Sequence, residues 1–487
     1  MENGKGEKLS LSTKIGFGLG DIYGGGSLMI IGFYYLYFLT DILLIDAKYA
    51  GIVFLISKAW DAVSDPIMGY LSDRTRTRFG RRRPYFLAGI VLIFLSFFMM
   101  WYPVDFSREL HRVVYVLIAY LFFSTVITMV MVPYNALASE LTLDYNERTS
   151  LSSFRIFFSS VSSLVCAVLP MEIVKMFPSE RQGFVVMAVS FGLFFALPFL
   201  ATFFSTEERK EFQGRSEGIP FIRVFTEPFK TPTFVHVLLM YLFAFVAMDM
   251  VMAIVIYFMT YYLHRGGETN YVLGVLLVVQ ILALPFFYWV SRRTSKKTGY
   301  IIAALIWIGV MLVSFLITPD LQPFYIYVFG AIVGLSTGGV VIMIYSIFPD
   351  VPDVDELYSG QRREGIYSGL YTFMRKLSSA VGIFLISNAI SIAGYRKPVR
   401  QVIDGVEKMV QQEQSQEFIL VLRVVFVVLP VIFLAGALLF AFRYTLTPGL
   451  HARLKAYLDR RRTGEGDDGT FAREERELKN ALRGETR

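Results

Sequence analysis

The chain has 487 residues, of which 55% are hydrophobic and 18% charged, and its formal net charge is +7. Soluble domains are about 45–50% apolar and about 25% charged, so this composition excludes an ordinary soluble protein and predicts a polytopic membrane protein. The basic residues lie at the ends of apolar segments and in the C-terminal tail, so we expect no nucleic-acid partner. Cys166 is the only cysteine, which excludes an internal disulfide and a cysteine-rich metal site.

Twelve segments are long and apolar enough to cross a bilayer, because about 20 apolar residues span its hydrocarbon core. Six are expected near residues 15–39, 47–72, 84–103, 113–138, 151–171 and 183–204. Six more are expected near residues 233–262, 270–291, 299–317, 323–347, 365–392 and 417–443. The sequence therefore predicts an all-α integral membrane protein with 12 transmembrane helices.

The chain is expected to divide into an N-terminal six-helix half (1–204), a connector (205–232), a C-terminal six-helix half (233–443) and a basic tail (444–487). A repeat supports two related halves. The second span ends in SDRTRTRFGRRRP and the eighth ends in SRRTSKKTGYI, so a basic cluster and a glycine follow the second span of each half. This arrangement is typical of transporters built from two related six-helix halves.

Arginine and lysine set the expected orientation. They gather in loop 73–83, the connector, loop 292–298 and the tail, and they are sparse in most of the alternating loops. Loop 393–416 departs from this pattern because it also carries basic residues. By the positive-inside rule, both termini and the connector are expected to face the cytoplasm. We expect a monomer that lies in the lipid bilayer of the cell membrane.

The second span carries charged residues in its interior. Asp61 and Asp65 are four residues apart, so on a helix they lie on one face, and Lys58 can lie on the same stripe. Ionisable groups inside a span usually face a cavity or a partner and are functional. Pro66 lacks an N–H and so frees the carbonyl oxygen of Ala62. The pattern predicts a Na⁺ or H⁺ site, with a static ion-pair lock between helices as the alternative.

Two further features stand out in the second half and the tail. Asp249 lies mid-span within FVAMDMVMAIV, where it is expected to bind substrate or join a proton relay. The alternative is a structural hydrogen bond between helices. In the tail, Leu450, Leu454 and Leu458 recur every four residues among basic residues, which predicts an amphipathic helix on the cytoplasmic leaflet.

The loop after the second span resembles a motif of the major facilitator superfamily, in the pattern GxxxDR…GRR (Gly69, Asp73, Arg74, Gly80, Arg81 and Arg82). Within the span, WDAVSDPIMG resembles the melibiose permease group, the glycoside–pentoside–hexuronide:cation symporters. The resemblance continues in PYNALASELTLDYNERTSLSSFR (133–155) and FPDVPDVDELYSGQRREGIYSGLYTFMRK (348–376). It covers nearly the whole chain and implies a major facilitator fold of 6+6 helices.

The resemblance implies roles for residues that match the family pattern. Asp61 and Asp65 match acids that bind the coupling cation, and Thr128 matches a threonine near that site. Lys376 matches a lysine needed for transport, with a structural counter-ion to the two acids as the alternative. Lys58 is the other expected charge partner, and Arg155 matches an arginine linked to the sugar site.

A cytoplasmic gate is also implied, in which acids pair with arginines. Its residues here are Asp73, Arg74, Arg148, Asp350, Asp353, Glu356 and Arg362. For the acids, the alternative is a solvated charged loop without a gating role.

The sugar site departs from the family pattern, which places one acid on helix one and another on helix four. The corresponding positions here are Tyr23, Gly24, Gly25, Met131 and Asn135. Tyr23 and Asn135 are the side chains that we expect to contact substrate, together with Arg155 and Asp249. The glycines at positions 24–26 are expected to leave space in helix one.

These features favour a secondary symporter that imports a sugar, glycoside or related organic solute by alternating access. Its partners would be the small-molecule substrate and a coupling cation, Na⁺ or H⁺, with no other cofactor. A lysolipid or amphiphile symporter is the main alternative, because the sugar-binding acids are not matched. A membrane-embedded enzyme is disfavoured because the four histidines are scattered and no nucleophile lies beside a base. A non-transporting sensor is a further alternative.

Overall fold

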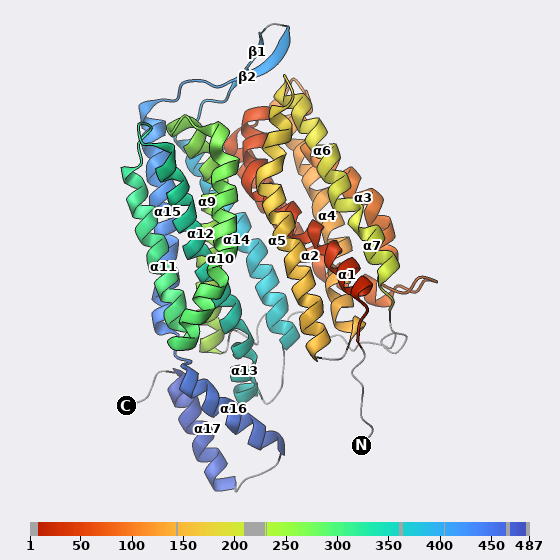
Figure 1. The fold of residues 1–487 in the computed structure, drawn as a ribbon, viewed down its shortest axis with the longest axis vertical. Coiled ribbons are helices and arrows are strands. Elements are labelled where there is room, and N and C mark those ends of the chain that lie inside the picture. The colour runs from red at the N-terminus through yellow and green to blue at the C-terminus, as the bar shows by residue number, and fades with distance from the viewer. Residues whose placement is uncertain are drawn as a thin grey trace. The chain divides into compact units, whose positions relative to one another are not determined.

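The computed structural model describes residues 8–142, 145–208, 229, 231–359, 364–403, 405–463 and 468–483. Helices dominate it (Figure 1). The helices of the first six predicted spans are α1 (Leu11–Ile30), α2 (Ala47–Arg74), α3 (Arg83–Trp101), α4 (Glu109–Leu141), α5 (Tyr145–Lys175), α6 (Glu180–Ala196) and α7 (Pro198–Ser205). The remaining long helices are α9 (Pro232–Tyr257), α10 (Thr269–Arg293), α11 (Lys296–Val313), α12 (Pro323–Ile347), α14 (Glu364–Ile392) and α15 (Gln416–Arg443).

Shorter elements extend or connect these helices. Helical turns continue α1 as η1 (Ile31–Tyr35) and η2 (Phe38–Ile42), and continue α9 as η5 (Phe258–Tyr262). The others are η6 (Gly266–Glu268), η7 (Ser314–Leu316), η8 (Phe348–Asp350), α13 (Val351–Ser359), α16 (Pro448–Thr463) and α17 (Asp468–Arg483). The strands β1 (Val399–Ile403) and β2 (Val406–Val410) form one antiparallel hairpin.

The prediction of twelve spans is confirmed. Eleven helical stretches of the described chain are long and apolar enough to cross a membrane. The twelfth predicted span is α2, which has 28 residues but carries Lys58, Asp61 and Asp65 in its middle. Charge, and not length, therefore distinguishes α2 from the other spans.

Close packing groups the chain into two units. Unit 1 holds Met1–Glu217, Met252–Gly274 and Ile383–Leu422, and unit 2 holds Gly218–Val251, Val275–Gly382 and Arg423–Arg487. Each unit is a group of residues that lie close together in space. The predicted division into two six-helix halves stays a prediction.

In unit 1, α1 lies directly against α5 because its glycines allow a close approach. A Cβ atom added at Gly25 would lie 2.1 Å from Ser159 Oγ, and one added at Gly26 would lie 2.1 Å from Ser162 Oγ. A Cβ atom at Gly24 would similarly meet a neighbouring side chain at 2.5 Å. Small residues of this kind let membrane helices pack backbone to backbone. The expectation that these glycines leave space in helix one is therefore wrong.

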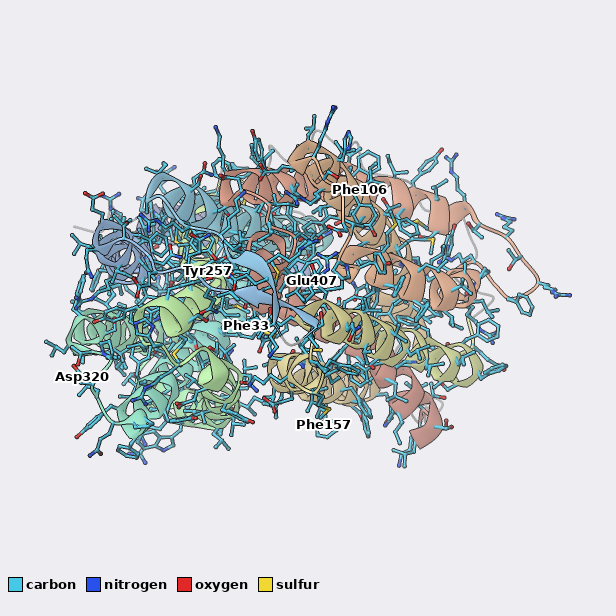
Figure 2. All side chains as sticks on the ribbon, turned by 90° about the horizontal axis from the view of Figure 1, so that it is seen from above. Phe33, Phe106, Phe157, Tyr257, Asp320 and Glu407 are labelled. Atoms are coloured by element: carbon cyan, nitrogen blue, oxygen red, sulfur yellow. The ribbon has the colours of Figure 1, made fainter. Side chains whose placement is uncertain are left out.

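The hairpin β1–β2 lies at the end of unit 1 opposite the start of α1 (Figure 1). Gly405 occupies its turn with a φ of +77°, a conformation that glycine adopts without a steric penalty. Arg400 bonds Glu407 at 2.7 Å across the hairpin and Asp105 at 2.8 Å in the loop after α3. Figure 2 looks onto this end, with Glu407 labelled on the hairpin. No strand was predicted for this part of the sequence.

In unit 2, the tail helices α16 and α17 bury leucine side chains inside the protein. Leu454 and Leu458 of α16 are buried, as are Leu478 and Leu482 of α17. A hydrogen bond of 3.0 Å between His451 and Asp353 also ties α16 to α13. The predicted helix is therefore present, but Leu454 and Leu458 contact protein instead of forming a face toward lipid.

Candidate functional site

The acids of α2 each meet a hydroxyl group from α4. Asp61 is 1% exposed, and its carboxylate accepts a hydrogen bond from Ser124 Oγ. The same carboxylate forms an ion pair with Lys58 Nζ at 3.2 Å. One turn further along, Asp65 Oδ1 accepts a hydrogen bond of 2.6 Å from Thr128 Oγ1. The four-residue spacing on α2 is thus matched by the same spacing on α4.

This set of groups is chemically suited to a small hard cation or a proton. Two unit charges 6 Å apart repel by about 3 kcal/mol at an effective dielectric constant of 20, and Lys58 offsets part of that repulsion at Asp61. Carboxylate and hydroxyl oxygens are the ligands that hard cations prefer. The structure brings Asp61, Asp65 and Thr128 onto one helix–helix interface, and cation binding there stays a prediction. It adds Ser124, which the matching spacing to Thr128 would have revealed.

A second group of polar side chains in unit 1 joins α1 to α5. Arg155 Nη2 lies 3.2 Å from Asp21 Oδ1, and the guanidinium group lies 5.3 Å from the ring centre of Tyr134. Asp21 is buried, whereas the side chain of Arg155 is 30% exposed. Helix one thus has an acid, Asp21, in contact with Arg155, and a role for this pair in substrate binding stays a prediction.

Tyr23 and Asn135, the two other residues of unit 1 that are predicted to contact substrate, differ in their exposure to solvent. Tyr23 is fully buried, and its ring lies within 6.1 Å of the rings of Phe123, Phe195 and Phe199. It belongs to the aromatic core of the unit and is not presented to a substrate in this structure. Asn135 is exposed on α4. Its contact with substrate stays a prediction.

In unit 2, Asp249 forms a bidentate ion pair with Arg375 of α14. Arg375 Nη1 lies 2.5 Å from Asp249 Oδ2, and Nη2 lies 3.0 Å from Oδ1. The side chain of Asp249 is 6% exposed and that of Arg375 is 33% exposed. Phe245 lies under the guanidinium group at 4.8 Å, and Gly382 allows α14 to approach Asp249 closely. Sequence reasoning missed Arg375, although a second cation beside Lys376 in an apolar helix was a signal for it.

Lys376 follows Arg375 on α14 and thus belongs to unit 2. Asp61 takes its lysine partner, Lys58, from its own helix. The role of Lys58 as a charge partner is therefore consistent with the geometry, and the role of Lys376 stays a prediction.

The loop between α2 and α3 is held by an acid that the sequence did not single out. Both carboxylate oxygens of Glu208 accept backbone N–H bonds, from Arg81 at 2.8 Å, Arg82 at 2.7 Å and Arg83 at 2.9 Å. Arg74 is exposed and stacks over a tyrosine ring at 3.8 Å. The side chains of the predicted gate residues Asp73 and Arg148, and the whole of Arg362, lie outside the described residues.

Two acids of the predicted gate, Asp350 and Asp353, have basic partners among the described residues of unit 2. Asp350 bonds Lys296 Nζ at 2.5 Å, and Asp353 bonds the imidazole of His451 at 3.0 Å. Glu356 lies half-buried on α13. Two acids thus join α13 and the turn before it to α11 and α16, and their action as a gate stays a prediction.

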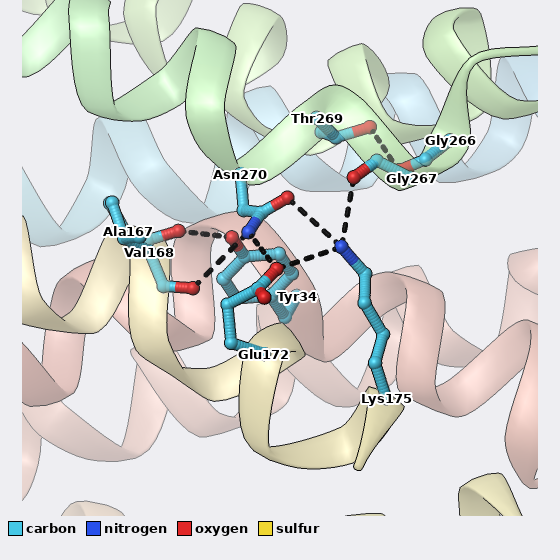
Figure 3. A network of polar contacts seen from close by, with 9 residues as sticks. All are labelled: Tyr34, Ala167, Val168, Glu172, Lys175, Gly266, Gly267, Thr269 and Asn270. Atoms are coloured by element: carbon cyan, nitrogen blue, oxygen red, sulfur yellow. Dashed lines mark hydrogen bonds and ion pairs between the residues drawn. The ribbon is translucent and has the colours of Figure 1, made fainter.

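A further polar network ties the end of α5 to the start of α10 (Figure 3). Lys175 Nζ lies 2.9 Å from Glu172 Oε1 and donates to the carbonyl oxygen of Gly267 at 2.8 Å. Asn270 donates to Glu172 at 2.6 Å. The negative charge of Glu172 is thus matched by an adjacent lysine, and none of these contacts was predicted.

Several known proteins are similar to this chain in sequence or in fold. Residues 16–448 match the family model described as MFS/sugar transport protein. The chain is 27% identical to a putative glycoside/cation symporter of Escherichia coli, over 94% of this chain and 97% of that protein. It is 25% identical to a sodium-dependent lysophosphatidylcholine symporter of Gallus gallus, over 80% of each chain. The crystal structure of the nucleoside transporter NupG has a similar fold, with a TM-score of 0.59, 12% identity and coverage of 89% and 97% of the two chains.

Proposed function

Because the chain belongs to the family described as MFS/sugar transport protein, we propose that it is a cation-coupled symporter that imports a sugar, glycoside or related organic solute. Na⁺ or H⁺ would drive uptake across the cell membrane by alternating access, with both chain termini in the cytoplasm. The members of this family that it resembles are transporters and not enzymes.

The hydrogen bonds between α2 and α4 are the observation that most supports coupling of a cation to transport. Asp61 and Asp65 are held four residues apart, and each accepts a hydrogen bond from a hydroxyl group of the neighbouring helix. A cation or proton bound between them would relieve their mutual repulsion. One positive charge that moves with a neutral substrate through 100 mV gains about 2.3 kcal/mol. That energy supports roughly 50-fold accumulation.

Two ion pairs, one in each unit, support a polyhydroxylated substrate. Arg155 with Asp21 and Arg375 with Asp249 each present N–H donors beside carboxylate acceptors. Adjacent hydroxyl groups of a sugar donate and accept hydrogen bonds at once, so such pairs match them. Each pair also carries no net charge, which favours a neutral solute over an ionic one.

A lysolipid substrate is the second candidate, and the named relative from Gallus gallus is the observation that favours it. Two sequence features also favour this alternative: the unmatched sugar-binding acids of helices one and four, and the space expected at the glycines of helix one. Asp21 supplies an acid on helix one, and neighbouring side chains of α4 and α5 lie against the glycines, so these two points do not support a lysolipid. The acid of helix four stays unmatched. The structure therefore gives more support to a sugar or glycoside.

Transport in proteoliposomes tests the proposal. Purified protein would be reconstituted, and uptake of labelled mono- and disaccharides, aryl glycosides and lysophosphatidylcholine would be measured under an imposed Na⁺ or pH gradient. We expect uphill uptake of at least one glycoside with one of the two gradients. Uptake of lysophosphatidylcholine alone would select the second candidate, and equal uptake with and without a gradient would overturn cation coupling.

A further inference from the structure

A carboxyl group in unit 1, remote in sequence from the acids of α2, is enclosed by hydroxyl groups. Asp41 lies in η2, beyond the candidate span that ends at Tyr35, and it is 1% exposed. Its oxygens accept hydrogen bonds from Thr40 Oγ1 at 2.6 Å, from Tyr395 OH at 2.8 Å and from Tyr261 OH. Asp41 is therefore a buried acid with three hydroxyl donors.

These donors come from three separate parts of the chain. Tyr261 lies in η5, and Tyr395 follows the end of α14. The oxygens of the two phenol groups also lie 2.6 Å apart, so each phenol can donate its one hydrogen either to Asp41 or to the other phenol. Tyr257 OH lies 2.6 Å from Thr40 Oγ1 and can donate to it. The carboxyl group is thus the centre of a network that holds η2, η5 and the segment after α14 together.

No cation forms an ion pair with Asp41 in the described part of the chain. Glu180 of α6, which interacts with Asp41, is also an acid. The charged residues that lie close in sequence to the members of the network have other partners: Lys397 bonds Glu109 at 2.8 Å, Arg265 lies 3.9 Å from Glu268, and the carboxylate of Asp46 accepts from the N–H of Lys48. The remaining titratable groups around it are the phenols of Tyr37, Tyr257, Tyr261 and Tyr395. Glu172 at the end of α5 differs, because Lys175 lies beside it.

The network can also accommodate a proton on the carboxyl group. A protonated Asp41 must donate one hydrogen bond, and Thr40 Oγ1 lies 2.6 Å from its Oδ2. Thr40 can in turn donate to the carbonyl oxygen of Leu36 at 3.1 Å or to the phenol of Tyr257. The hydroxyl hydrogens therefore need only rotate, and no buried donor is left without an acceptor.

We propose that Asp41 is a proton-binding site, separate from the Asp61–Asp65 site, whose protonation keeps η2, η5 and the segment after α14 joined. A neutral carboxyl group is compatible with a buried position that lacks a cation, whereas a carboxylate there is penalised by its lost hydration. Loss of the proton thus favours separation of the three segments and entry of water. This inference goes beyond the proposed symport, because Asp41 need not contact the substrate or the coupling ion.

The direction of the pH effect follows from burial. Burial without a cation raises the pKa of Asp41 to about 6, although the hydroxyl donors act in the opposite direction. The folded protein therefore binds this proton more tightly than the unfolded chain does, where the pKa is about 4. The stabilisation is fully present below pH 4 and is lost as the pH rises through about 6.

Cysteine labelling of the purified full-length protein tests the proposal without any substrate. Leu43, which follows η2, is buried, so Leu43→Cys with Cys166→Ser reports opening of this network. Val402→Cys on the hairpin, where the side chain is 73% exposed, corrects for the pH dependence of the maleimide reaction. We expect the corrected labelling rate to rise roughly tenfold from pH 5 to pH 7, as a group with a pKa near 6 ionises.

Two variants decide whether Asp41 is responsible. Asp41→Asn keeps a neutral group of the same shape and should remove the rise, with a low rate at both pH values. Tyr395→Phe removes one donor to the carboxylate and should move the midpoint of the rise to higher pH. A rise of the same size and midpoint in both variants would overturn the proposal, as would a rate in the wild type that does not depend on pH. These outcomes are independent of whether any solute is transported.

Discussion

Thr128 of α4 donates its hydroxyl hydrogen to Oδ1 of Asp65 on α2 across 2.6 Å, and so fixes one oxygen of the carboxylate against the neighbouring helix. We expect Thr128→Val to weaken the apparent affinity for the coupling cation roughly 2- to 12-fold, since one hydrogen bond contributes about 0.5–1.5 kcal/mol. Cation-dependent thermal stabilisation of purified protein would measure this. Thr125→Val is the matched control, because Thr125 bonds Trp60 and not an acid. Equal effects of both variants would contradict the assignment.

Arg155 should contribute to substrate binding and not to cation binding. Arg155→Ala removes charge-assisted donors worth about 1.5–3 kcal/mol, so substrate affinity should fall roughly 10- to 150-fold. Stabilisation by the cation alone should be unchanged, because Arg155 contacts Asp21 and not the acids of α2. Lys175→Ala, at the far end of the same helix, should leave substrate affinity as it is. Loss of cation binding in Arg155→Ala would refute the separation of the two sites.

Arg375 and Lys376 are neighbours on α14 with different expected roles. Arg375→Ala leaves the carboxylate of Asp249 buried without its partner, so we expect a loss of about 2–3 kcal/mol in the free energy of unfolding. The estimate lies below the value for a fully buried pair because a third of Arg375 is exposed. Asp249→Asn in the same chain should restore part of that loss.

Lys376→Ala, by contrast, should abolish accumulation of substrate while leaving the unfolding temperature near that of the wild type. Uptake against a gradient and thermal unfolding would be measured on the same preparations. Normal accumulation in Lys376→Ala would remove this lysine from the transport mechanism.

The orientation in the membrane can be tested at two open glycines. A Cβ atom at Gly267 or at Gly449 would meet no atom within 4 Å, so a cysteine fits at either position. With Cys166 replaced by serine, we expect Gly267→Cys to react with an impermeant maleimide in intact cells. Gly449→Cys should react only after the cells are opened. The opposite pattern would invert the proposed topology.

The sequence predicted the helices well because their signals are local. Long apolar stretches and basic loops indicated all twelve spans, and the spacing of Asp61 and Asp65 indicated one face of α2. Thr128 was found through a family resemblance, and the structure places it on that face. These features depend on residues within one helix or on a pattern that the family shares.

Contacts between distant segments could not be predicted in the same way. Arg375 meets Asp249 across 126 positions of sequence, and Tyr395 meets Asp41 across 354. Nothing in the local pattern of either partner specifies the other. The glycines of α1 show the same limit, because a glycine leaves space or closes it according to which helix lies opposite.

The central claim, that the acids of α2 couple a cation to transport, is tested most directly by neutralising each of them. Asp61→Asn and Asp65→Asn would be reconstituted in proteoliposomes. Uphill uptake of the sugar, glycoside or lysolipid that the wild type transports would be compared with its counterflow exchange in the same vesicles. Each variant loses a hard oxygen ligand and the repulsion that a cation relieves. We expect uphill uptake to fall to the level without a gradient while exchange is retained in at least one variant. Accumulation at the wild-type level in both variants would show that Asp61 and Asp65 only lock two helices together.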